Sequence, residues 1–86
     1  MATICFDVNG TLVSERGPRY EIIQILLTLK SLGHEVFVWS AGGADYAEEW
    51  VQRLGLGVPA LMKGQIHPDI AVDDGERGLG TVDLRV

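Results

Sequence analysis

The sequence predicts an α/β domain built on a mainly parallel sheet of about five strands. Short apolar runs rich in β-branched residues are typical of strands, and two longer segments between the first three runs carry apolar residues at helical spacing. The resulting order is strand, helix, strand, helix and then three strands, which is typical of an α/β layer with a parallel core. A content of 47% hydrophobic and 22% charged residues also indicates a globular chain.

The first strand and the first helix are the clearest elements. The run "ATICF" predicts a buried strand that Asp7 closes. Pro18 stands where the first residue of a helix would, and Gly33 is a typical stop. Between them, apolar residues at helical spacing form one stripe, which consists of Ile22, Ile25, Leu26, Leu29 and Leu32. Further apolar residues widen this stripe, so we expect a helix that is covered on two sides or that presents an apolar face to a partner.

The second strand and the second helix follow directly. The run "EVFVW" predicts a strand that ends at Ser40, and helical spacing continues over residues 44–54, with Gly55 as the stop. Both tryptophans are expected in the core.

The last three strands are short. The run "VPALM" is a weak third strand because Pro59 cannot donate a ladder hydrogen bond. The run "DIAVD" is a stronger fourth strand, and "TVDLRV" alternates in the manner of an edge strand.

Length, charge and cysteine content limit the classes of function. A chain of 86 residues allows one domain, here taken as residues 1–86, with a thin stability margin that a partner chain would supplement. The net charge of −5 and the lack of a basic run argue against binding nucleic acid through its phosphates. The single Cys5 is expected as a buried hydrophobe in a reducing compartment. No segment is apolar enough to span a membrane, so we expect a cytoplasmic protein.

Polar side chains follow four of the predicted strands. Asp7 ends the first, Ser40 ends the second, Lys63 follows the third, and Asp73 with Asp74 ends the fourth. Each alone is most simply structural. Since ligands bind at the carboxyl ends of the strands in open parallel sheets, the joint pattern predicts a site at this edge.

The residue types suggest phosphoryl chemistry with Mg²⁺. Asp7 and Asp73 carry the oxygen ligands that Mg²⁺ prefers, and Asp7 is also a candidate nucleophile. Ser40 would hydrogen-bond a phosphoryl oxygen, and Lys63 would offset the negative charge. Backbone amides of the "VNGTL" loop are candidates for a small anion nest.

The Asn9-Gly10 pair permits a different interpretation. Such a pair between apolar runs is a strong signal for a two-residue β-hairpin turn. The residues after it, "TLVSERGP", do not form a strand of matching length. We therefore favour a turn that leads Asp7 out of its strand.

These motifs resemble the haloacid dehalogenase superfamily. The stretch "ICFDVNGTL" is similar to the first phosphatase motif at all but one position, and "IAVDD" resembles the fourth motif. "VFVWS" and Lys63 resemble the weaker second and third motifs. The resemblance covers nearly the whole chain, with all four motifs in order.

The resemblance implies a Rossmann-like three-layer sandwich with strand order 3-2-1-4-5. It implies Asp7 as the nucleophile, with Asn9, Ser40 and Lys63 completing the catalytic positions. It also implies two sets of ligands. Mg²⁺ would be held by Asp7, the backbone carbonyl of Asn9, Asp73 and Asp74, and phosphate by Gly10, Thr11, Ser40, Ala41 and Lys63.

The loops where family members insert a cap are too short for one here. Capless members tend to act on exposed phosphates of macromolecules or to assemble so that a neighbour covers the site. Two partners are therefore expected. One is a phosphorylated substrate, which includes macromolecular substrates, and the other is a second copy of the chain.

The chain departs from the motif at Asn9, where the phosphatases carry an aspartate that acts as general acid and base. Asparagine exchanges no proton at neutral pH, so a factor of about 10²–10⁴ would be lost. Four explanations remain open: a slow phosphatase, a silent binding or regulatory domain, a deliberate replacement that traps a state, and a dehalogenase-like hydrolase. Deamidation of Asn9-Gly10 would restore an aspartate. A receiver domain is a further alternative. In that fold, however, the acidic pair follows the first strand, whereas in this chain the pair Asp73-Asp74 follows the fourth.

Overall fold

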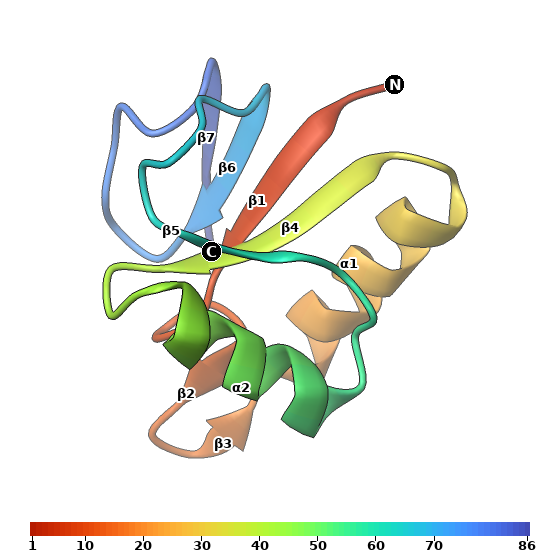
Figure 1. Ribbon diagram of the computed structural model, residues 1–86, viewed down its shortest axis with the longest axis vertical. Helices are drawn as coiled ribbons and strands as arrows, with labels where there is room; N and C mark the ends of the chain where they lie inside the picture. The colour runs from red at the N-terminus through yellow and green to blue at the C-terminus, as the bar shows by residue number, and fades with distance from the viewer.

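The computed structural model of the protein describes all 86 residues and contains one five-stranded parallel sheet (Figure 1). The strand order is β5-β4-β1-β6-β7. Numbered along the chain without the small hairpin β2–β3, this order is 3-2-1-4-5, as expected. The five strands are β1 (Thr3–Asp7), β4 (Glu35–Ser40), β5 (Ala60–Met62), β6 (Ile70–Asp73) and β7 (Val82–Arg85).

The two helices lie between the first three strands of the sheet. Helix α1 spans Tyr20–Ser31 and helix α2 spans Ala44–Leu54. Gly55 adopts a left-handed conformation with φ 64°, which ends α2 as predicted. The predicted start of α1 was wrong, because Pro18 lies in β3 and Arg19 precedes the first helical residue.

Both helices pack on the same face of the sheet. Ile4 and Phe6 of β1 point to this face and join one core cluster with Leu26 of α1 and Val51 of α2. Strands β1 and β4 pair in register from Thr3–Glu35 to Asp7–Trp39, so alternate residues of both strands point to the same face. The helices therefore form one continuous layer over the strands.

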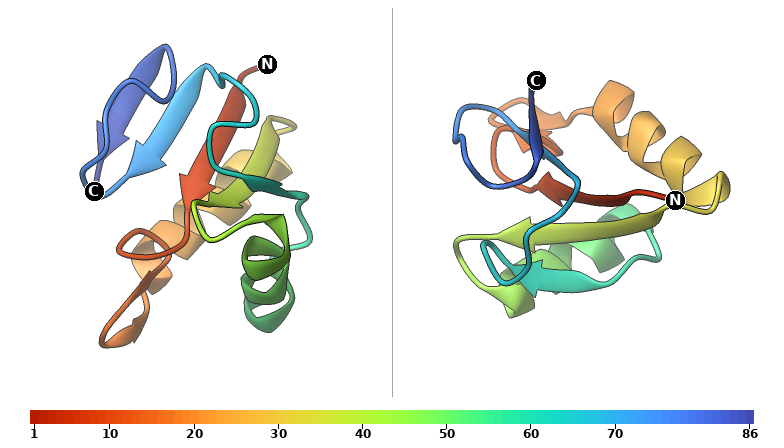
Figure 2. Two further views of the ribbon diagram at one scale, coloured as in Figure 1. Left: turned by 60° about the vertical axis from the view of Figure 1, so that its left-hand side comes forward. Right: turned by 90° about the horizontal axis from the view of Figure 1, so that it is seen from above.

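Loops cover the opposite face, so the expected three-layer sandwich was wrong. Cys5, Trp39 and Ala71 form a smaller cluster there, packed against Ile66 and Leu79 from the segments before and after β6. These two segments are too short to carry helices as well as the turns at both ends. Figure 2 shows the strands of the sheet side by side from two further directions.

The core predictions for Cys5 and Trp39 are confirmed, since both side chains are fully buried. Burial raises the pKa of the Cys5 thiol to about 12, which keeps it protonated and inert. Trp50 lies at the edge of the core and carries Arg53 over its ring, 5.1 Å from the centroid.

A short hairpin follows the first strand, but Asn9-Gly10 is not its turn. The hairpin consists of β2 (Val13–Ser14) and β3 (Gly17–Pro18), and it turns at Glu15-Arg16. Gly10 lies in a separate tight turn, where its N–H donates to the carbonyl of Val13 over 2.7 Å. The preference for a turn leading out of β1 is therefore confirmed.

No helix in the structure has the length and hydrophobicity needed to cross a bilayer.

Candidate active and metal site

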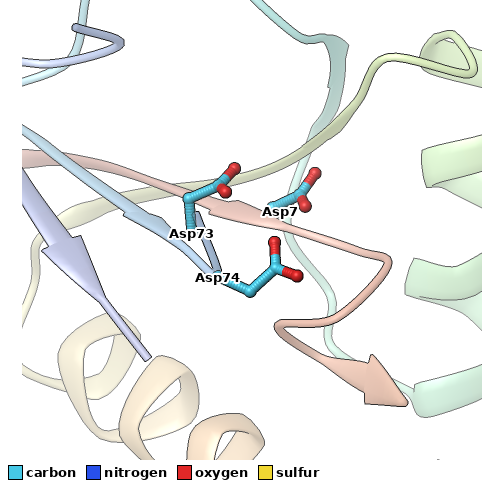
Figure 3. Close-up of side chains that lie close together, drawn as sticks. All are labelled: Asp7, Asp73 and Asp74. Atoms are coloured by element: carbon cyan, nitrogen blue, oxygen red, sulfur yellow. The ribbon is translucent and has the colours of Figure 1, made fainter. Parts of the chain in front are cut away.

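Three carboxylates gather where two neighbouring strands end. Asp7 is the last residue of β1, Asp73 is the last residue of the adjacent β6, and Asp74 follows it. One oxygen from each carboxylate lies within 4.8 Å of the others. Figure 3 shows the three side chains close together at the ends of these strands. The sequence-predicted metal carboxylates thus share one location.

Lys63 bridges the carboxylates from the loop after β5. Its Nζ atom lies 2.7 Å from Oδ2 of Asp73 and 3.4 Å from Oδ1 of Asp7. The backbone N–H of Lys63 donates to the carbonyl of Ser40, which fixes the start of this loop against the end of β4. Lys63, whose resemblance to a motif was weak in the sequence, therefore contacts both Asp7 and Asp73.

Glu76 adds a fourth carboxylate. Its Oε1 atom lies 3.3 Å from Nζ of Lys63, and its backbone N–H donates to Oδ1 of Asp73. Sequence reasoning missed this residue, because nothing in its spacing distinguishes it from a solvent-exposed loop charge. Only the turn after Asp73 brings it back over Lys63.

The two buried aspartates differ in their ionisation. Burial raises the pKa of Asp7 to about 6, Lys63 partly opposes this rise, and the negative charge of Asp73 adds to it. Burial also opposes ionisation of Asp73, but hydrogen bonds from Lys63 and from the backbone N–H groups of Glu76 and Gly75 outweigh it and lower the pKa. Asp73 is therefore the more firmly ionised of the two.

Lys63 is also firmly held in its charged form. Burial alone would lower its pKa, but the surrounding carboxylates raise it above the ordinary value. The lysine is fully protonated at neutral pH and balances part of the negative charge around it.

Asp74 lies directly against the turn after β1. A Cβ placed on Gly10 would overlap the carboxylate of Asp74, and Gly10 has φ 83°, a region that favours glycine. The glycine of "NGT" therefore permits a close approach between the loop after β1 and the acidic loop after β6. Sequence alone shows the glycine but not the side chain that needs the space.

The side chain of Asn9 is exposed and is held by α2. The hydroxyl of Tyr46 donates a hydrogen bond of 2.9 Å to its Oδ1 atom. In the sequence, Tyr46 is one residue of the predicted second helix, and no signal in the chain links it to a residue 37 positions earlier. The contact places a phenol against the amide oxygen of Asn9.

The predicted anion nest was wrong for Gly10 and Thr11. Their backbone N–H groups donate to the carbonyls of Val13 and Val8, so neither is free in this turn. The hydroxyl of Thr11 is buried and has no hydrogen-bond partner. These amides serve the turn itself.

The predicted phosphate ligands after β4 are arranged differently. The Oγ atom of Ser40 is buried and accepts a 3.0 Å hydrogen bond from the N–H of Gly42, which closes a tight turn. Ala41 is exposed at this turn. Ser40 therefore shapes the loop leading into α2 and lies at the same end of the sheet as Asp7.

Comparisons with known proteins leave the family of this chain open. No family model, curated protein or solved structure matches it.

The carboxylates of Asp7, Asp73 and Asp74 fit a hard divalent cation. All three offer oxygen ligands within the span that one ion requires, and Asp7 and Asp73 are held by buried strand ends. Lys63 is the cation already in contact with this group, and one ammonium leaves the cluster net negative. Burial raises the pKa of Asp7, the negative charge of Asp73 adds to this rise, and a bound cation would oppose both effects.

Proposed function

We propose that this protein is a Mg²⁺-dependent phosphoryl-transfer domain in which Asp7 is the nucleophile. The observation that carries the proposal is the position of Asp7, which is 7% exposed, lies 3.4 Å from the Lys63 ammonium and is grouped with the carboxylates of Asp73 and Asp74. A nucleophilic carboxylate needs a neighbouring positive charge to receive a phosphate dianion. Lys63 provides part of that charge from within the chain.

In the proposed first step, an oxygen of Asp7 attacks phosphorus and the bond to the leaving-group oxygen breaks. The phosphoryl group is then carried by Asp7 as a mixed anhydride, and the leaving group departs with the electron pair. Lys63 stays protonated and offsets the charge on the phosphoryl oxygens. When bound by Asp7, Asp73, Asp74 and the carbonyl of Asn9, Mg²⁺ would shield the negative charge of the incoming phosphate.

Asn9 weakens both proton transfers in this scheme. An alkoxide leaving group needs a proton in the first step, and the attacking water must lose one in the second. The Asn9 amide supplies neither, and its Oδ1 atom is already a hydrogen-bond acceptor for Tyr46. We therefore expect slow turnover that favours leaving groups stable without a proton.

The short connection between β1 and α1 supports a large substrate. Only the β2–β3 hairpin, with two residues in each strand, lies between β1 and α1. No inserted domain covers Asp7. A phosphate on the surface of a macromolecule fits this arrangement, because the macromolecule itself would exclude water.

A second candidate function is a binding or regulatory domain that holds Mg²⁺ and phosphate without turnover. Asn9 favours this alternative, because the same residue that removes the acid and base leaves the metal carboxylates in place. The two functions differ in whether Asp7 becomes phosphorylated.

Turnover of p-nitrophenyl phosphate with Mg²⁺ tests the proposal. We expect slow hydrolysis by the natural chain and a gain of about 10²–10⁴ for Asn9→Asp, because that change restores an acid and base. Asp7→Asn in either background is the control and should remove the activity. Activity that survives Asp7→Asn would contradict the proposed nucleophile.

A reactive phosphoryl donor separates the two candidate functions. If the protein is an enzyme, adding acetyl phosphate and Mg²⁺ should raise its intact mass by one phosphoryl group. This mass increase should be absent in Asp7→Asn. An unchanged mass together with calorimetric Mg²⁺ binding would favour the silent domain. Loss of both signals would rule out the site.

A further inference from the structure

Strand β7 is an unpaired edge of the sheet, and all four of its residues are exposed. The N–H groups of Val82 and Val86 donate inward to the carbonyls of Asp69 and Asp73. Because hydrogen-bonding groups alternate in direction along a strand, the N–H and C=O groups of Asp83 and Arg85 point outward. Such an edge is a template for pairing with another chain.

An apolar groove lies beside this edge on the helix-covered face. It has a volume of about 280 Å³, and each of its nine lining residues is hydrophobic. Leu84 and Val86 of the C-terminal strand region form one wall, with exposures of 48% and 38%. Ile25 on α1 faces the same groove and is 49% exposed. Exposed apolar side chains gathered beside an open sheet edge favour contact with a partner.

We propose that β7 pairs antiparallel with β7 of a second copy about a two-fold axis that passes through Leu84. This register uses every residue from Val82 to Val86. It places Val82 opposite Val86 of the partner subunit and Leu84 opposite Leu84 of the partner subunit. Asp83 then lies opposite Arg85 of the partner subunit, and the outward backbone groups of these two residues form the hydrogen-bonded pairs.

The register is self-complementary on both faces of the sheet. Val82 and Leu84 are in register with Ile70 and Val72, so they share the apolar face that carries the helices. Asp83 and Arg85 alternate with them and point to the other face. Apolar residues therefore meet apolar residues and opposite charges meet across the seam, which are the cross-strand pairs that stabilise antiparallel sheets.

Asp83 is held in the charged form needed for this pairing. Its carboxylate accepts backbone hydrogen bonds from Gly78, Gly80 and Leu79, which lower its pKa. Arg85 donates from Nε to the carbonyl of Asp74, which leaves the other guanidinium nitrogens for a carboxylate across the seam. The result is a continuous sheet through two copies, with the two apolar grooves meeting on one face.

Disulfide trapping tests the register directly. Two cysteines introduced by Leu84→Cys would face each other as a non-hydrogen-bonded pair, with Cα atoms about 4.5 Å apart, which is within disulfide reach. The two copies of a Val82→Cys change would lie about 14 Å apart, because they are offset by four residues along the strand. Cys5 is fully buried and does not compete. We expect a covalent dimer from Leu84→Cys under mild oxidation and none from Val82→Cys.

Sedimentation equilibrium tests the association itself. The natural chain should approach twice its mass of 9.4 kDa as concentration rises. Leu84→Lys should shift it to the monomer, because two ammonium groups would then meet at the axis. The control is Met62→Lys on β5, at the opposite edge of the sheet, where the side chain is 53% exposed, and it should leave the dimer intact.

Several outcomes would overturn this inference. They are a natural chain that stays monomeric throughout, a dimer that survives Leu84→Lys, and equal cross-linking of both cysteine variants. A monomer whose groove binds another protein's apolar segment would assign a different occupant. None of these results bears on the chemistry of the acidic site, which the inference does not use.

Discussion

The Nζ atom of Lys63 lies 2.7 Å from Oδ2 of Asp73, and the side chains are 11% and 3% exposed. Both groups have left water, so each depends on the other for compensation. Asp7 and Glu76 share the same ammonium at 3.4 and 3.3 Å. The lysine is therefore the positive centre of a cluster that would otherwise hold only carboxylates.

Replacing Lys63 with methionine should destabilise the protein by about 3 kcal/mol at pH 7, because it leaves buried carboxylates without their partner. Urea unfolding followed by tryptophan fluorescence measures the change. Lys30→Met is the matched control, since exposed Lys30 donates only to the backbone carbonyl of Leu56. We expect a loss below about 1 kcal/mol there. Equal losses in the two variants would show that the buried ion pair has no special weight.

Gly10→Ala should cost about 1–3 kcal/mol from backbone strain at positive φ, and more because its Cβ would overlap Asp74. Gly33→Ala separates the two effects, because Gly33 has φ 90° but open space around a Cβ. We expect the control to show the strain alone. Mg²⁺ affinity should fall only in Gly10→Ala, where Asp74 has to move, and calorimetry would reveal this difference. An equal affinity in both variants would contradict a metal role for Asp74.

The secondary structure was predictable from the sequence because each strand and helix follows local chemistry. The β-branched and apolar run before Asp7 and the glycine after α2 both depend on nearby residues. The hairpin Val13–Pro18 was missed, because strands of two residues are too short to show alternation. The missing helical layer could have been predicted, because the segments before and after β6 are too short to carry helices as well as turns.

The acidic site was predictable only in part. Strand ends in a parallel sheet meet at one edge, so Asp7 and Asp73 could be placed together from their positions alone. Tyr46 and Glu76 could not, because their contacts arise from how α2 and the last loop turn back over the site. The nest at Gly10 failed because a turn can consume its own amides.

Tyr46 provides a test of how Asn9 is positioned. In an Asn9→Asp background, the Tyr46 hydroxyl would donate to the new carboxylate and lower its pKa, because the hydrogen bond favours the ionised form. With p-nitrophenyl phosphate the leaving group needs no proton, so the ionised carboxylate serves as base. Adding Tyr46→Phe should therefore shift the rising limb of kcat against pH to higher pH. An unmoved limb would show that this hydrogen bond does not persist during turnover.

The raised pKa of Asp7 predicts that its contribution to the stability of the metal-free protein falls as pH rises. Unfolded Asp7 releases its proton near pH 3.8, whereas folded Asp7 retains it until about pH 6. Between these values the folded state binds more protons, so the free energy of unfolding contributed by Asp7 falls with increasing pH. Asp73 has the opposite shift, and its contribution is lost as pH falls below the unfolded value.

Urea unfolding of the natural chain and of Asp7→Asn at pH 4 and pH 7, both with chelator, isolates the Asp7 contribution. We expect the natural chain to lose stability relative to Asp7→Asn between these pH values, and Mg²⁺ to reduce that loss. A difference between the two chains that stays constant with pH would mean that Asp7 ionises normally in the folded protein.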